Sequence, residues 1–220
     1  MNDYPPLEVK VWGERACFTR PEMKVERVSY PVPTPSAARG ILEAILWKPE
    51  FAWRVREVWL LKPIRFLSIL RNEVNSRANP ASAMKWAGSD GGFFAEEDRA
   101  QRHTLALRDV AYLIRADISL KPHADKDSAA YRDQFRRRVH RGQCYHRPYL
   151  GCREFSADFG PPEEGEHPIR HEEELGKMLF DLDYAHDDKG RGVSGIPRFF
   201  DARIEGGILR VPAALYEGGS

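Results

Sequence analysis

The sequence predicts an α+β protein, because segments with strand periodicity alternate with segments with helical periodicity. The predicted elements in chain order are strand 7–18, helix 35–47, strand 51–66, strand 109–121, helix 127–142 and strand 148–160. The order strand, helix, strand, strand, helix, strand is typical of the ferredoxin-like (βαββαβ) unit, a four-stranded antiparallel sheet with two helices on one face.

The first strand and the first helix have local signals. In LEVKV, residues 7–11, apolar side chains alternate with charged ones, which is the pattern of a half-buried strand. Thr34 and Pro35 read as a helix N-cap followed by a favourable first helical residue, and Pro49 prevents the helix from continuing. These signals predict a helix over residues 35–47.

The second strand, residues 51–66, is rich in Val, Trp, Leu and Ile, and its alternation changes phase near Arg56 and Glu57. A phase change inside one strand predicts a β-bulge. Residues 72–104 then lose their periodicity and contain Gly and Pro. Because a structureless loop of this length is rare in a compact domain unless it is functional, we expect a protruding hairpin or flap over about 72–104.

The third strand and the second helix have the clearest patterns. In DVAYLIRADISLK, residues 109–121, every second side chain is apolar. Asp127 or Ser128 can cap the helix that follows, and Gly142 can end it. Tyr131 and two further apolar residues recur on the face of this helix that we expect to be buried.

The chain divides into two expected domains. Residues 1–160 are expected to form the ferredoxin-like domain, and residues 161–220 a small antiparallel β domain at the C-terminal end. Gly206 and Gly207 stand between two strand-like runs, which predicts a turn of a β-hairpin there.

The composition of the 220 residues, 42% hydrophobic and 30% charged, is that of an ordinary soluble protein. No apolar run approaches the ~18 residues of a membrane span, and the N-terminus lacks the basic-then-apolar form of a signal peptide. Three cysteines are too few for a disulfide scaffold. We therefore expect a cytoplasmic protein that contacts no membrane.

Charge is segregated along the chain, although the net charge is only +1. Residues 20–71 contain ten Lys and Arg against five Glu, whereas residues 158–188 contain eleven Asp and Glu against two basic residues. The segment FRRRVHRGQCYHRP, residues 135–148, carries five arginines and two histidines without a carboxylate. Because a polyanion responds to local potential, this segment predicts a nucleic-acid contact, with a solvated helix surface as the alternative.

Three stretches together resemble one known family. They are RACFTRPEMKVERVSYPVPTPSAARGILEAILWKP, ILRNEV and FRRRVHRGQCYHRPYLGCREF, with weaker similarity in GKMLFDLDY. The long motifs spread over about residues 12–155, so a chance match to a short pattern does not explain them. In these stretches the chain resembles the Cas five family of type I-C CRISPR-associated proteins, subtype d (also called c).

The resemblance implies an RRM-like, ferredoxin-like domain followed by a small β domain. It also implies the repeat-RNA processing subunit of the type I-C Cascade surveillance complex, whose partners are the stem-loop and 5′ handle of CRISPR repeat RNA and the other subunits. Family members are typically metal-independent endoribonucleases that cut precursor CRISPR RNA at the base of the repeat hairpin. No metal or other cofactor is expected, because the 2′-hydroxyl beside the scissile phosphate is the nucleophile.

The residues that carry catalysis in the family are largely absent. The resemblance places a Tyr or His of the first helix at Leu46, and a Lys-His pair of the second helix at Ala130 and Tyr131. Leucine and alanine transfer no protons, and a phenol with an ordinary pKa of about 10 is a poor base at neutral pH. Three hypotheses remain: a site rebuilt from neighbouring groups, weak cleavage through positioning and arginine charge, or binding without efficient catalysis.

The candidate site residues follow from these hypotheses. The groups that could rebuild the site are Lys121, His123 and Lys126 before the second helix and His140, Tyr145 and His146 after it. The expected catalytic residues are Tyr131, His123 and Lys126. The expected RNA-binding residues are Arg20, Lys24, Arg27, Arg71, Arg136, Arg137, Arg138, His140, Arg141 and Tyr145. A non-catalytic architectural subunit is the second expectation, and a protein that binds duplex DNA non-specifically through charge is the third.

Two clusters have residue types that bind metals, but neither is expected to hold a metal ion. Cys144, His146 and Cys152 fall short of a closed four-ligand zinc site, so buried thiols are expected. The acidic residues around 172–174 and 181–183 could imitate a two-metal nuclease site, but solvated surface charge explains them.

Four of the five tryptophans have an expected role. Trp47, Trp53 and Trp59 are expected in the core or on a sheet face rather than as platforms for bases. Trp86 and Lys85 on the flap could clamp RNA or a partner subunit.

Overall fold

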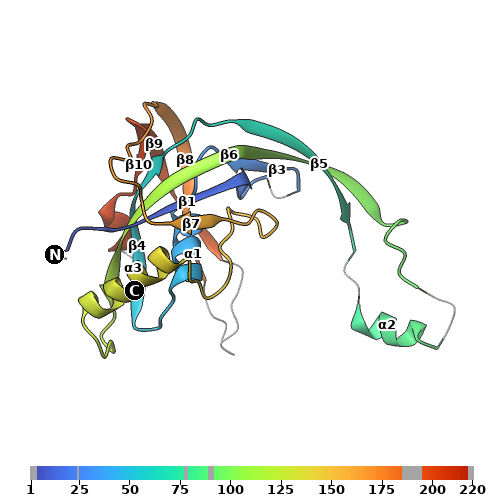
Figure 1. The fold of residues 1–220 in the computed structure, drawn as a ribbon. Helices are drawn as coiled ribbons and strands as arrows, with labels where there is room; N and C mark the ends of the chain where they lie inside the picture. The colour runs from blue at the N-terminus through green and yellow to red at the C-terminus, as the bar shows by residue number, and fades with distance from the viewer. Residues whose placement is uncertain (1–3, 24, 77–78, 89–91, 185–194, 218–220) are drawn as a thin grey trace.

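The structure is a computed structural model that describes residues 4–23, 25–76, 79–88, 92–184 and 195–217. It is a mixed α+β protein built mostly of sheet, with a long two-stranded arm that projects from the body (Figure 1). Over the described ranges, no helix is long and apolar enough to cross a membrane.

The chain begins with three strands, of which the second and third are short. The elements in chain order are β1 (Leu7–Ala16), β2 (Phe18–Thr19), β3 (Arg27–Tyr30), α1 (Pro35–Ile45), β4 (Phe51–Leu60), β5 (Phe66–Val74), α2 (Pro80–Trp86), β6 (Arg99–Leu120), α3 (Ser128–Arg141), β7 (Asp158–Gly160), β8 (Glu173–Asp183), β9 (Ile196–Glu205), β10 (Ile208–Arg210) and a 3-10 turn, η1 (Ala213–Tyr216).

The centre of the sheet is formed by β1 and β6. β1 pairs antiparallel with β6 on one side and with β7 on the other, and β6 pairs antiparallel with β4, which gives the local order β7-β1-β6-β4. The register of β4 against β6 shifts between Val55 and Glu57, which confirms the bulge predicted near Arg56. β4 ends at Leu60, short of the predicted end at residue 66.

Both α1 and α3 lie on the same side of this sheet (Figure 1). Thr34 caps the start of α1, as predicted: its hydroxyl accepts a hydrogen bond of 3.2 Å from the N–H of Ala37. Asp127, rather than Ser128, caps α3 through a 3.0 Å hydrogen bond from the N–H of Ala130. Gly142 ends α3 with a φ of 61°, a left-handed conformation that glycine adopts without a Cβ clash.

The side chains of α3 predicted to be buried do form its core face. Tyr131, Phe135 and Val139 are all buried. The ring centroid of Tyr131 lies 5.2 Å from that of Phe51, and the centroid of Phe135 lies 4.8 Å from that of Trp53. These aromatic contacts fix α3 against β4, so the outer face of the helix is left for polar and charged residues.

β5 and the first half of β6 form the arm. They pair from Phe66 opposite Leu107 to Val74 opposite Arg99, and α2 lies beyond them at the tip with no buried residue. Residues 72–104, predicted as a hairpin or flap, thus begin and end in strand. The sequence shows no strand periodicity there because neither face of the arm covers a core.

Residues 148–160 do not form the continuous strand that the sequence predicts. Only β7 is a strand, because the chain turns at Gly151, where φ is 86°, and packs against the end of β1. The N–H of Cys17 donates to the carbonyl of Leu150 at 2.9 Å. A Cβ at Gly151 would lie 2.0 Å from the Cys17 carbonyl oxygen, so this close approach requires glycine.

The last strands extend the sheet. β8, β9 and β10 pair antiparallel with one another in order, and Gly206 and Gly207 form the predicted turn with φ values of 58° and 77°. β10 also pairs with β4, which continues the sheet as β4-β10-β9-β8. Met178 and Ile204 belong to the same core cluster as β1. The division into domains at residue 160 stays a prediction.

Candidate functional site

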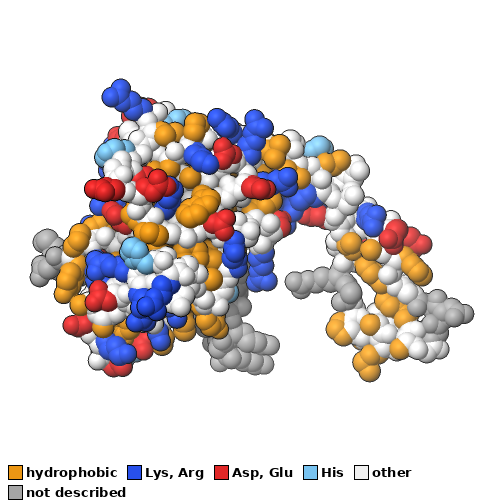
Figure 2. All heavy atoms as spheres, viewed as in Figure 1, with side chains coloured by type: hydrophobic (Ala, Val, Ile, Leu, Met, Phe, Trp, Pro, Cys, Tyr) orange, Lys and Arg blue, Asp and Glu red, His pale blue; other side chains and the backbone are white. Residues whose placement is uncertain are grey.

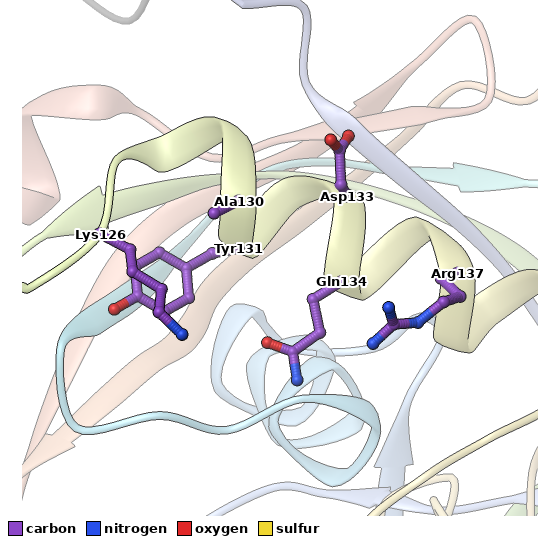
Figure 3. Close-up of a pocket in the computed structure, with 6 residues that line it drawn as sticks. All are labelled: Lys126, Ala130, Tyr131, Asp133, Gln134 and Arg137. Atoms are coloured by element: carbon purple, nitrogen blue, oxygen red, sulfur yellow. The ribbon is translucent and has the colours of Figure 1, made fainter.

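A surface pocket of about 440 Å³ opens beside the first half of α3. Two of its residues, Ala130 and Tyr131, are the positions at which the Lys-His pair was expected, and Lys126 lies with them. Figure 3 shows Lys126, Gln134 and Arg137 directed to one side of α3 and Asp133 to the other. The pocket is therefore bordered by two cations and an amide, groups that suit a phosphate, and also by the carboxylate of Asp133.

Tyr131 is held in the wall of this pocket. Its side chain is 2% exposed, and its hydroxyl donates a 2.9 Å hydrogen bond to Oδ1 of Asp125. Burial, and then the hydrogen bond to Asp125, raise the pKa of Tyr131 to about 12. The phenol stays protonated at neutral pH, so it can donate a hydrogen bond but is a poorer base than a free tyrosine.

Leu46, a third position that carries catalysis in the family, and His123, an expected catalytic residue, differ in exposure. Leu46 is fully buried, and its carbonyl accepts a 3.0 Å hydrogen bond from Nε1 of Trp53. His123 is exposed, with Nε2 at 3.1 Å from the carbonyl oxygen of Pro49. Because a carbonyl only accepts, Nε2 is the donor in this contact, and Nδ1 is the ring nitrogen left for another partner. His123 is not one of the described residues that line the pocket.

The outer face of α3 is cationic, and Lys and Arg side chains gather over this helix (Figure 2). Arg136 pairs with Asp133 at 3.3 Å, and both side chains are about half exposed or more. For Arg137, His140 and Arg141, which are exposed, no ion pair forms with any residue that the structure describes. Of these basic side chains, Arg136 is therefore paired with a carboxylate, whereas Arg137, His140 and Arg141 remain available to a ligand.

The ends of α1 and α3 meet at a surface that bears aromatic side chains. Arg138 donates a 2.5 Å hydrogen bond to the Ile45 carbonyl, and the N–H of Tyr145 donates to the Ala44 carbonyl at 2.8 Å. The Tyr145 side chain is 81% exposed and Trp47 is 59% exposed. An exposed aromatic ring can stack on a base, and the RNA-binding role expected for Tyr145 stays a prediction.

The expectation for Trp47 was wrong, because it is neither in the core nor packed on a sheet face. Trp53 is buried as expected, and Trp59 is partly buried, with Nε1 donating to Glu57 at 2.8 Å. Trp47 lies two residues beyond Ile45, the last residue of α1, where helical periodicity no longer predicts the direction of a side chain. Its exposure beside Lys48 is a signal that only the structure provides.

The arginines at the root of the arm are paired with carboxylates. Arg27 lies 3.1 Å from Glu154 and 3.6 Å from Glu73, and Arg71 lies 2.7 Å from Glu73 and 3.2 Å from Glu154. The two glutamates balance the charges of the two arginines, so Arg27 and Arg71 offer less attraction to RNA than the sequence suggests. Arg71 and Glu73 are neighbours on β5, but Arg27 and Glu154 come from separate segments, so only the tertiary structure reveals that they join the same network.

The two remaining cations expected to contact RNA belong to the same region of the chain. The Arg20 guanidinium lies over the Tyr30 ring, 4.4 Å from its centroid, and 3.9 Å from Glu22. Lys24 lies outside the described residues.

The side chains considered as metal ligands form contacts with other residues of the chain. Asp181 pairs with Arg39, Glu173 pairs with His171 at 2.8 Å, and Cys152 lies against Cys17. In the part of the chain that the structure describes, no three His, Cys, Asp or Glu side chains are grouped so as to hold a metal ion.

Comparison with known proteins identifies the family. A family model described as a CRISPR-associated protein (Cas_Cas5) matches residues 6–212. The chain belongs to this CRISPR-associated family. Two curated relatives are both named CRISPR pre-crRNA endoribonuclease Cas5d. That of Thermus thermophilus is 51% identical over 224 residues, or 96% of this chain and 93% of that protein. That of Mannheimia succiniciproducens is 42% identical over 220 residues, or 94% of each.

Solved structures share the fold. One described as the crystal structure of a CRISPR-associated protein matches with a TM-score of 0.64 at 22% identity, covering 94% of this chain and 92% of that chain. A functionally uncharacterized protein of Streptococcus mutans matches with a TM-score of 0.63 at 20% identity over the same shares. At these identities the likeness concerns the fold alone.

Proposed function

We propose that this protein binds CRISPR repeat RNA, cuts precursor CRISPR RNA at the base of the repeat hairpin and keeps hold of the 5′ handle. Membership of the Cas5 family and a 51% identical relative named a pre-crRNA endoribonuclease support this proposal. The observation that carries it is the cationic outer face of α3 beside the pocket at Ala130 and Tyr131. The partners are the stem-loop and handle of the RNA and the other subunits of a type I-C complex in the cytoplasm.

The reaction proceeds without a metal ion, because the RNA supplies its own nucleophile. The 2′-oxygen beside the scissile phosphate attacks phosphorus as it loses its proton. A 2′,3′-cyclic phosphate forms, the bond to the 5′-oxygen breaks, and that oxygen takes a proton. The protein aligns these atoms, accepts and returns the proton, and stabilises the charge on the phosphorane.

Each candidate residue takes the task that suits its charge and its hydrogen-bonding groups. The ammonium of Lys126 and the guanidinium of Arg137 border the pocket, so they stabilise the charge that develops on the phosphate. His123, with Nδ1 as an acceptor, receives the proton of the 2′-hydroxyl. Tyr131, whose raised pKa keeps it protonated, acts as a hydrogen-bond donor and positions the start of α3 through Asp125.

The fold that supports this site is the ferredoxin-like unit. The antiparallel order β7-β1-β6-β4, with α1 and α3 on one side, agrees with the connectivity of that unit. In this proposal residues 161–220 act as a small β domain appended to it, and α3 presents its outer face to the RNA.

An architectural subunit without efficient catalysis is the second candidate. Leu46 is buried and Ala130 ends at a methyl group, so two of the three family positions offer no group to the reaction. Such a subunit would bind the 5′ handle and contact other subunits without cutting. A third arrangement, charge-driven binding of duplex DNA, would show little preference for repeat RNA.

One experiment separates these functions. The protein is incubated with labelled repeat RNA in excess EDTA, and with duplex DNA of the same length over a series of salt concentrations. A single cut at the hairpin base that Lys126→Ala or His123→Ala slows without weakening binding supports the enzyme. Binding of uncut RNA supports the architectural subunit. Equal affinity for the two nucleic acids, falling steeply with salt, contradicts both.

A further inference from the structure

Two cysteines from distant parts of the chain meet where the segment at residues 150–152 crosses the end of β1. The Sγ of Cys152 lies 3.5 Å from the carbonyl oxygen of Cys17, although the residues are 135 positions apart. The hydroxyl of Thr19 lies 3.5 Å from Sγ of Cys17 and 4.0 Å from Sγ of Cys152. One hydroxyl thus bridges the two sulfur atoms.

A cation is directed at one of these sulfur atoms. Nη1 of Arg27 donates to Sγ of Cys152 at 3.4 Å. A guanidinium in contact with sulfur stabilises the thiolate, which is the nucleophilic form of cysteine. Cys17 is fully buried, whereas Cys152 is partly exposed, so only Cys152 combines a cationic neighbour with access for a small reagent.

The titration of the pair agrees with this geometry. The hydrogen bond from the Cys17 thiol, opposed by burial and assisted by the charge of Arg27, lowers the pKa of Cys152 below its usual range. The same hydrogen bond, with burial, raises the pKa of Cys17. Glu154, which also pairs with Arg27, acts against the thiolate of Cys152. At neutral pH the negative charge therefore resides on Cys152 and the proton on Cys17.

We propose that Cys152 is an oxidation site for peroxides and that Cys17 is its resolving thiol. The Cys152 thiolate attacks one peroxide oxygen, so that an S–O bond forms, the O–O bond breaks and hydroxide leaves. The sulfur of Cys17 then loses its proton and attacks the Cys152 sulfur, so that an S–S bond forms, the S–O bond breaks and water leaves. Two thiols together give two electrons to the peroxide, which is reduced to water.

The disulfide would change the root of the arm. It would tie the segment at residues 150–152 to the end of β1 and remove the thiolate that Arg27 contacts. Arg27 would then be held by Glu73 and Glu154 alone. Because the bond closes a long loop of the unfolded chain, oxidation should raise the melting temperature by roughly 5–15 °C.

The test uses the reduced full chain and hydrogen peroxide. After a brief exposure near neutral pH, remaining thiols are alkylated, and the protein is characterised by intact mass and peptide mapping. The wild-type chain and Cys144→Ser should each lose the mass of two hydrogens and yield a peptide that links Cys17 to Cys152. In Cys17→Ser, dimedone should trap a sulfenic acid at Cys152. Absence of the linked peptide from both of the first two proteins overturns the proposal.

A second measurement does not depend on any variant. In the native wild-type chain at mildly acidic pH, a small alkylating reagent should modify Cys152 about tenfold faster than Cys144, because the Arg27 guanidinium contacts the sulfur of Cys152. Equal rates, or faster reaction at Cys144, would also overturn the proposal. Circular dichroism of Cys17→Ser establishes that its fold is retained before its reactivity is compared.

Discussion

At the scale of single residues, the positions expected to catalyse have different environments. Leu46 is enclosed in the core, and Tyr131 is fixed by Phe51 and Asp125. Ala130 is exposed at the pocket, beside Lys126. A functional group can therefore be restored at Ala130 without disturbing the packing of the core, but not at Leu46.

The substitution Ala130→Lys should increase the cleavage rate. It adds an ammonium at the pocket, where the family places a lysine, and a correctly placed catalytic group is worth about 10²–10⁴-fold, so a gain of at least about tenfold is expected. The measurement is single-turnover cleavage of repeat RNA in EDTA at saturating protein. Gln143→Lys is the matched control, because it adds the same charge to the basic segment outside the pocket. An equal gain in both variants would show that charge, rather than its position, is responsible.

A second residue-scale prediction concerns the turn at Gly151. Gly151→Ala should reduce the free energy of unfolding by roughly 2–4 kcal/mol, because a Cβ there meets the Cys17 carbonyl and the backbone is left-handed. Gly165→Ala is the matched control, since Gly165 is also left-handed, at φ 76°, but a Cβ there meets nothing within 4 Å. Denaturant unfolding of both variants separates the steric cost from the backbone cost. Similar losses would mean that the segment moves away from Cys17.

At the scale of elements, α3 determines where the positive charge lies. Asp127 and Gly142 fix its ends, and its aromatic face is anchored on β4, so the rotation of the helix about its axis is set. Arg137 and Arg141 are four residues apart, and neighbours at this spacing lie on the same side of a helix. They form a short cationic row that reaches from the pocket towards the aromatic surface at the ends of α1 and α3.

The double substitution Arg137→Ala with Arg141→Ala should weaken repeat-RNA binding and make it less dependent on salt. Each lost phosphate contact lowers the slope of log affinity against log salt by about 0.7–0.9, so a total reduction of about 1–2 is expected. Binding titrations at several salt concentrations measure this slope. Arg203→Ala is the control, since Arg203 is exposed on β9 and pairs with Glu205 at 3.1 Å. A slope unchanged from the wild type would show that these arginines contact no phosphate and are only solvated surface residues.

At the scale of the whole molecule, the body and the arm differ in what stabilises them. The body has a continuous core that includes residues of β1, α1, α3 and β8. The arm is stabilised by strand pairing, and Met84 in α2 at its tip is 80% exposed. The tip in Figure 2 accordingly shows hydrophobic side chains on its surface, away from the body.

Replacement of residues 76–97 by a two-residue Asn-Gly turn should leave the body folded. The strands remain paired up to Asn75, whose N–H donates to the Asp98 carbonyl at 3.0 Å, and a short turn can close them there. The melting temperature should change by no more than about 3 °C, because α2 buries nothing. Thermal unfolding followed by circular dichroism measures it. A larger decrease would show that the tip packs against the body in solution.

The sequence by itself determined what depends on neighbours within a few positions. The cap at Thr34, the end of α3 at Gly142, the bulge near Arg56 and the buried face of α3 were predicted, because short-range sterics and hydrogen bonds decide them. The positive charge of α3 was also predictable from the sequence, since five arginines without a carboxylate lie within residues 135–148.

Only the tertiary structure decided which distant groups meet. Arg27 and Arg71 looked available to RNA, but Glu73 and Glu154 neutralise them. Trp47 looked like a core residue and is exposed. Cys152 was expected to be an ordinary buried thiol, but it is partly exposed. Its sulfur contacts Arg27 and lies near the Thr19 hydroxyl, which also contacts the sulfur of Cys17. The physical reason is that chain folding, rather than local periodicity, sets the distance between residues far apart in sequence, such as Arg27 and Glu154 or Cys17 and Cys152, and therefore their charge and reactivity.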